Sequence, residues 1–130
     1  MTDSIQTPSA FCSFATKGSA HELFGLLLSL SVHHPNSKVY LRTDTETKNY
    51  ILRSTPKLPL NISYNVCLDE YTNTNRSQMD DKSWTDFMKQ KIFLIKDVLK
   101  QETDVLFLDS DIILTAPQIH EQFDLDYGNT

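Results

Sequence analysis

Short apolar segments of strand length alternate along this chain with longer segments of helical period, and this alternation is the strongest constraint on its fold. Strand-length runs span residues 10–15, 38–43, 61–68 and 104–109. Helical patterns cover residues 19–33 and 83–101, and a polar stretch from residue 44 can start a short helix. Strands that alternate with helices predict an α/β domain with a mostly parallel sheet flanked by helices.

Local signals predict where the helices begin and end. Ser19 and Glu22 have the spacing of a capping box, in which the serine caps the first turn and the glutamate reciprocates, and Pro35 prevents the helix from continuing. Ser83 is expected to open the long helix, and the polar stretch 69–82 before it reads as a surface excursion.

Composition limits what the chain can do. The 130 residues carry a net charge of −5 and are 39% hydrophobic, which predicts one compact domain over 1–130 and argues against a nucleic-acid partner. The N-terminus lacks a basic and apolar leader and no apolar run reaches membrane-spanning length, so a cytoplasmic protein is expected. Cys12 and Cys67 are expected to be reduced core residues, and the three scattered glycines exclude a dinucleotide fingerprint or a phosphate loop.

Two acids follow the apolar run of the fourth predicted strand and separate it from a second apolar run. Residues 105–108 are apolar, Asp109, Ser110 and Asp111 follow, and 112–114 are apolar again. Ligands of open α/β sheets bind at the carboxyl ends of the strands. Two carboxylates at such an end can hold Mg²⁺ or Mn²⁺ against a diphosphate, whereas burial beside apolar neighbours makes an unpaired pair costly. We therefore expect Asp109 and Asp111 to be metal ligands.

The segment 105–114, VLFLDSDIIL, resembles the DXD segment of nucleotide-sugar-dependent glycosyltransferases of the GT-A fold. The resemblance extends over the order of elements from residue 10 to about residue 116. It implies a Rossmann-like donor-binding domain, a UDP-sugar as the donor, an Mn²⁺ or Mg²⁺ cofactor, and sugar transfer to an unidentified acceptor. It also implies nucleotide-sugar contacts at Ala15, Thr16, Asp44 and Ser110.

Lys91 is a candidate on independent grounds. At about 100° per residue it lies roughly 20° from Trp84, in the middle of the apolar stripe of its helix, whereas Lys89, Lys96 and Lys100 point away. A lysine in that position either extends to solvent or meets an anion at the edge of the core. We expect it to contribute to binding the donor phosphates, and the extension to solvent stays open.

Glycosyltransferases of this type continue beyond the DXD strand with an acceptor-binding half, so residues 1–130 are expected to be the donor-binding part and catalytic competence does not follow. A non-catalytic nucleotide-binding or interaction module of the same fold is the alternative. A haloacid-dehalogenase-type phosphatase fits less well, because Ile112 and Ile113 stand where that motif needs a small residue and a hydroxyl.

A sheet that ends at its DXD strand has an uncovered edge, which favours homo-oligomers.

Overall fold

The computed structural model describes residues 7–54, 57–72 and 80–118. Four strands and three α-helices alternate through this part of the chain, with two short 3₁₀ turns between them. The elements are β1 (Ala10–Ala15), η1 (Lys17–Ser19), α1 (Ala20–His33), β2 (Lys38–Thr43), α2 (Thr45–Ser54), β3 (Asn61–Val66), η2 (Asp69–Tyr71), α3 (Asp81–Leu99) and β4 (Leu106–Phe107). Within the described residues no helix is long and apolar enough to cross a bilayer.

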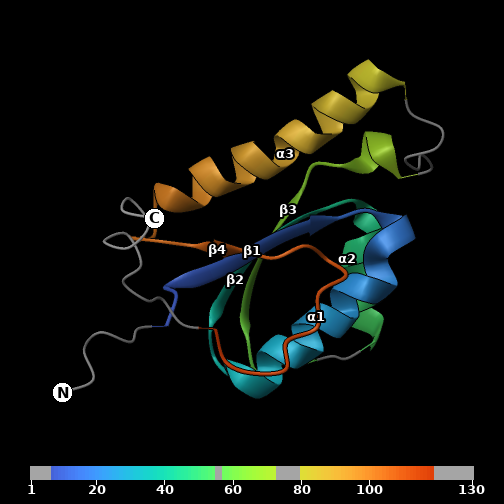
Figure 1. Ribbon diagram of the computed structural model, residues 1–130. Helices are drawn as coiled ribbons and strands as arrows, with labels where there is room; N and C mark the ends of the chain where they lie inside the picture. Colours follow the sequence, from blue (N-terminus) through green and yellow to red (C-terminus); the bar gives the residue numbers. More distant parts are fainter. Residues whose placement is uncertain (1–6, 55–56, 73–79, 119–130) are drawn as a thin grey trace.

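The four strands form one sheet in the order β3-β2-β1-β4, and every neighbouring pair is parallel. Helices α1 and α2 cover one face of the sheet and α3 covers the other (Figure 1). The predicted α/β class and the parallel sheet are confirmed. Strand β4 lies at one edge of this sheet, as expected, and the self-association predicted from that edge stays a prediction.

Strand β1 is buried because it lies between two strands and between two layers of helix. Alternate residues contribute to two cores, as the period of a strand requires. Phe11 and Ala15 pack against α1 and the β2 side chains on the same face of the sheet. Ala10 and Cys12 point to the other face and pack with Leu94 and Val98 of α3. The apolar run at 10–15 is therefore explained by burial on both faces.

The predicted capping box is wrong. Ser19 precedes α1 but its side chain makes no capping hydrogen bond, and its N–H, which Glu22 would have to bond, already donates to the Thr16 carbonyl in η1 at 2.8 Å. The predicted start of α3 at Ser83 is also corrected. The helix begins at Asp81, and the carboxylate of Asp80 caps it by accepting the N–H of Ser83 at 2.7 Å.

Two burial predictions are corrected as well. Cys12 is buried, but Cys67 is exposed, because it follows β3 on the face of that strand where Asn61, Ser63 and Asn65 are exposed as well. The last strand was expected over 104–109 with burial on both faces. Its ladder contains only Leu106 and Phe107, which are half-buried, because an edge strand has a single neighbour.

Candidate functional site

The sheet has a switch point between β1 and β4. From β1 the chain adds β2 and then β3 on one side, crosses the sheet through α3, and adds β4 on the other side of β1 (Figure 1). The strand order therefore reverses between β1 and β4, and open α/β sheets bind ligands outside the carboxyl ends of their strands at such a point. Ala15 ends β1 at this place and Thr16 follows it, and Asp109 comes two residues after the end of β4.

Asp109, Ser110 and Asp111 form a tight turn directly after β4. The N–H of Ile112 donates to the carbonyl of Asp109 at 3.1 Å, and the N–H of Leu108 donates to the carbonyl of Cys12 at 3.0 Å. Both acids are exposed and Ser110 is half-buried. The expected burial of the two acids is therefore wrong, because the turn lifts them out of the apolar sequence on either side.

Residues 112–118, here called the strap, run back along α1 (Figure 1). The N–H of Leu114 donates to the buried hydroxyl of Ser29 at 3.0 Å, and the N–H of Gln118 donates to Nε2 of His34 at 2.6 Å. Burial lowers the pKa of His34, and His33 adds to the effect, so the ring stays neutral and can accept. The strap holds the turn from its C-terminal side. Sequence reasoning missed Ser29 and His34, for which no local pattern exists.

Asp44 caps α2 with a completely buried carboxylate. One oxygen accepts the N–H of Thr47 at 2.9 Å, and the other accepts the N–H of Lys17 at 2.9 Å and the hydroxyl of Thr72 at 2.8 Å. Burial would raise its pKa, but the hydrogen bonds outweigh this and hold the pKa below its ordinary value. A direct contact between Asp44 and a nucleoside would have to replace some of these bonds.

The other predicted nucleotide contacts gather near the switch point. Ala15 and Thr16 are both buried, at 3% and 9% exposure, so their side chains offer little accessible surface to a ligand at this end of β1. Ser110 lies within the acid turn itself. Ala15, Thr16 and Ser110 thus share one edge of the sheet with the acids, and their contacts with a ligand stay predictions.

Lys91 points inward, as its position on the helical wheel predicts. Its Nζ lies 4.5 Å from the ring centroid of Phe107, in the strand that leads into the acid turn, and the side chain is half-buried. Burial raises the pKa of the Cys12 thiol to about 12, and the charge of Lys91 opposes this shift. Lys89, Lys96 and Lys100 are exposed, as expected.

The described residues contain no group of three or more His, Cys, Asp or Glu side chains that could hold a metal ion unaided. Mg²⁺ commonly takes one or two carboxylates and completes its shell with water and substrate phosphates. Two exposed carboxylates on one turn supply oxygen ligands of the kind that Mg²⁺ and Mn²⁺ prefer. The residues present therefore fit a divalent cation that is shared with a ligand.

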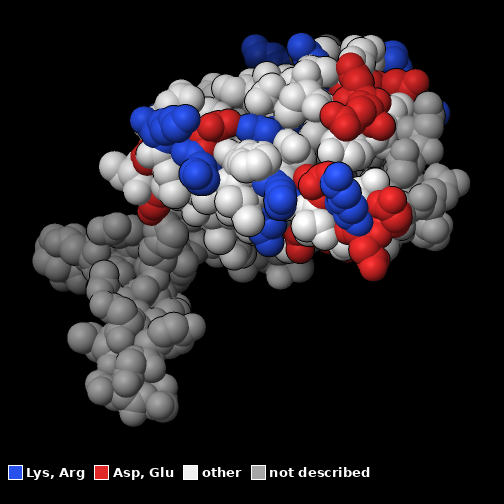
Figure 2. All heavy atoms as spheres, turned by 90° about the horizontal axis from the view of Figure 1, so that it is seen from above, with Lys and Arg blue, Asp and Glu red and all other residues white. Residues whose placement is uncertain are grey.

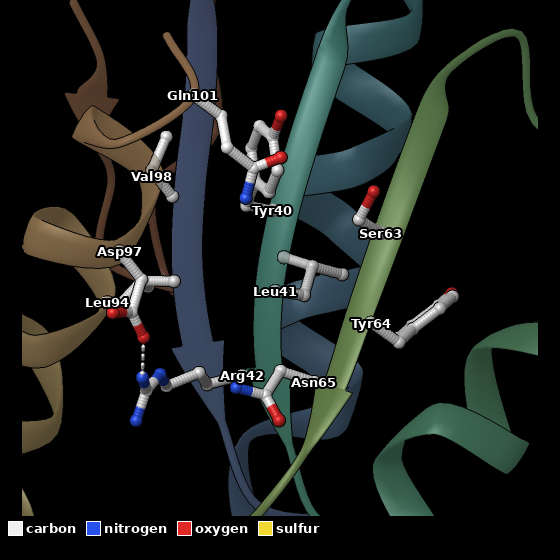
Figure 3. A pocket seen from close by; sticks show the side chains of 10 residues that line it. All are labelled: Tyr40, Leu41, Arg42, Ser63, Tyr64, Asn65, Leu94, Asp97, Val98 and Gln101. Carbon is white, nitrogen blue, oxygen red and sulfur yellow. Dashed lines mark hydrogen bonds and ion pairs between the residues drawn. The ribbon is translucent and has the colours of Figure 1, made fainter.

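A polar groove of about 390 Å³ lies elsewhere, on the α3 face over β2 and β3. Arg42 reaches across from β2 to Asp97 of α3, and Ser63 and Asn65 project from β3 (Figure 3). Gln90 also accepts from the Arg42 guanidinium, at 2.8 Å. Neither acid of the turn lines this groove, so it is separate from the switch point. Its lining residues are Tyr40, Leu41, Arg42, Ser63, Tyr64, Asn65, Leu94, Asp97, Val98 and Gln101.

Comparison with known proteins does not extend this description. No protein-family model matches the chain, and no curated protein matches it at a significant level.

Proposed function

We propose that this chain binds a nucleotide-sugar, a UDP-sugar by its resemblance, through a divalent cation held by Asp109 and Asp111. The observation that carries the proposal is the position of these acids, exposed on one turn after β4 at the switch point of a parallel sheet. In this proposal the domain is the Rossmann-like donor-binding part of a GT-A glycosyltransferase.

The chain's own residues would each act on a different part of the donor. Ala15 and Thr16 would form the floor beneath the nucleoside, and Asp44 would keep η1 and α2 in place through its hydrogen bonds to Lys17 and Thr47. Lys91 lies beside the strand of the acid turn and would attract the diphosphate. When bound, Mn²⁺ or Mg²⁺ would offset the negative charge of the diphosphate leaving group.

Transfer of the sugar to an acceptor is the reaction that the resemblance implies, and the catalytic residues for it are not identified. The alternative is a binding module of the same fold without turnover. Hydrolysis of a UDP-sugar by the purified protein separates the two, because a binding module would bind the UDP-sugar and leave it intact, releasing neither UDP nor sugar.

Calorimetric titration with UDP, with and without Mn²⁺, tests the binding proposal. We expect binding that requires the metal and that falls at least tenfold in Asp109→Asn and in Asp111→Asn, because each change removes one charged ligand. Asp86→Asn on α3 is the matched control, since it removes the same charge from a residue outside the turn and should leave the affinity unchanged. An absence of heat in the native protein under both conditions would refute the proposal.

Lys91→Ala tests the second element of the site. Loss of a charged donor to a phosphate should weaken UDP by roughly tenfold, and circular dichroism should show an unchanged fold. Lys89→Ala is the control, because Lys89 is on the same helix but faces solvent. Equal affinities in both variants would mean that Lys91 only packs against Phe107.

A further inference from the structure

The solvent-facing side of α3 combines lysines with large apolar side chains. Taking Lys96 as the centre and about 100° per residue, eight residues of 82–100 fall within roughly 60° of it, and all eight are exposed. We call this set the outer face of α3. It consists of Lys82, Thr85, Lys89, Ile92, Phe93, Lys96, Leu99 and Lys100.

The apolar members of the outer face are well exposed. Ile92 is 57% exposed, Phe93 44% and Leu99 48%, although all three are large apolar side chains. The inner side is already filled by Leu94 and Val98 against Cys12 and Ala10. Exposed apolar side chains gathered on one side of a helix indicate a surface that meets something less polar than water.

The charge on this face has the opposite sign to that of the chain as a whole. Four lysines lie on the arc, and the one acid that shares it is Asp81 at the start of the helix, whereas the whole chain carries −5. Figure 2 looks down on α3 and shows basic side chains spaced along the helix, with both acidic and uncharged surface between them. Two of these lysines lie near acids outside the arc. Lys89 is 3.9 Å from Asp86 and Lys100 is 3.5 Å from Asp97, and exposed ion pairs of this kind contribute little to stability.

The mixture of side chains favours a lipid surface over a protein partner. Protein interfaces are depleted in lysine at their centre. In an interfacial helix, by contrast, apolar side chains enter the boundary between headgroups and acyl chains, while lysines extend to the anionic headgroups. We propose that the outer face of α3 docks on an anionic membrane surface, with Ile92, Phe93 and Leu99 inserted and the lysines on the headgroups.

Flotation with lipid vesicles tests this proposal on the intact protein. Vesicles of phosphatidylcholine with about 30% phosphatidylserine should carry the protein upward, and vesicles of phosphatidylcholine alone should not. The triple variant Lys89→Gln, Lys96→Gln, Lys100→Gln should bind roughly a hundredfold less, because each lysine near an anionic surface contributes about fivefold. The charge-matched control is Lys17→Gln, Lys48→Gln, Arg53→Gln; Lys17 is in η1 and the other two are in α2, which covers the opposite face of the sheet.

The apolar contribution needs its own variant. Ile92→Ser with Phe93→Ser should weaken binding roughly a hundredfold, whereas Leu28→Ser with Val32→Ser on α1, which are similarly exposed, should have no effect. All four positions are on the surface, so the fold should survive each change. Failure of the native protein to float with anionic vesicles, or equal losses in the α3 variants and their controls, would overturn the proposal. Association into dimers without any vesicle binding would assign the face to a second copy instead.

Discussion

At the scale of single residues, Asp44 shows how a buried charge can hold several segments together. Its carboxylate joins η1, the first turn of α2 and Thr72, which are distant in the sequence. Each donor satisfies part of a charge that would be costly to bury alone. The residue therefore stabilises the edge of the sheet where the candidate site lies, whether or not it touches a ligand.

Replacing Asp44 tests that role. Asp44→Asn turns one acceptor oxygen into a donor that faces other donors, so we expect the free energy of unfolding to fall by about 2 kcal/mol in urea denaturation. Asp80→Asn is the control, because that residue caps α3 at an exposed position and should lose less. An equal loss of unfolding free energy in both variants would show that the buried Asp44 carboxylate stabilises the fold no more than an exposed helix cap does.

The pH dependence follows from the direction of the Asp44 pKa. The folded pKa lies below the ordinary value of 3.8, so the unfolded chain takes up the proton first as the pH falls. Stability from this group is complete above pH 3.8 and is lost as the pH falls through the folded pKa. Denaturation series at several pH values should show a steeper loss in the native protein than in Asp44→Asn, and parallel curves would contradict this.

The two cysteines should differ sharply in reactivity. Cys12 is buried with a pKa raised to about 12, so its thiolate is scarce at pH 8, whereas Cys67 is exposed. A colorimetric thiol reagent should modify one thiol in the folded protein and two in denaturant. Cys67→Ser should abolish the reaction of the folded protein, and persistence of that reaction would mean that Cys12 is accessible.

At the scale of elements, the buried hydroxyl of Ser29 joins the strap to α1. Ser29→Ala leaves the Leu114 N–H without its acceptor, which should cost about 1–3 kcal/mol in urea denaturation. Ser31→Ala is a close control, since that hydroxyl donates only to the Leu27 carbonyl on its own helix and is half-buried. Similar losses in both variants would show that the strap is not held at Ser29.

At the scale of the whole molecule, the sequence predicts the elements better than their arrangement. The bounds of β1 and β2 follow from apolar runs with clear limits, and both strands match the prediction. Cys67 was misplaced because it follows β3 on the face where the polar residues of that strand are exposed, and alternation at 61–68 continues beyond the last paired residue, Val66. The order of the strands and the hydrogen bonds of Asp44 depend on contacts between distant segments, which a local pattern does not contain.

The candidate site was predicted in part for the same reason. The two acids and the inward position of Lys91 can be found from local sequence, because they depend on a strand end and on helical period. Ser29 and His34 support the strap from another element, and only the folded chain brings them to it. Exposure of the acids likewise depends on the turn closed by the Ile112 N–H.

Because the Leu108 amide is bonded to Cys12 and the Leu114 amide to Ser29, the five residues between them are clamped at both ends by the N-terminal third of the chain. An excised peptide carrying the two acids would lack both clamps and would have to pay the ordering entropy itself upon capturing a cation. Cation capture should consequently slow deuterium uptake at those two amides, far along the chain from the residues that secure them.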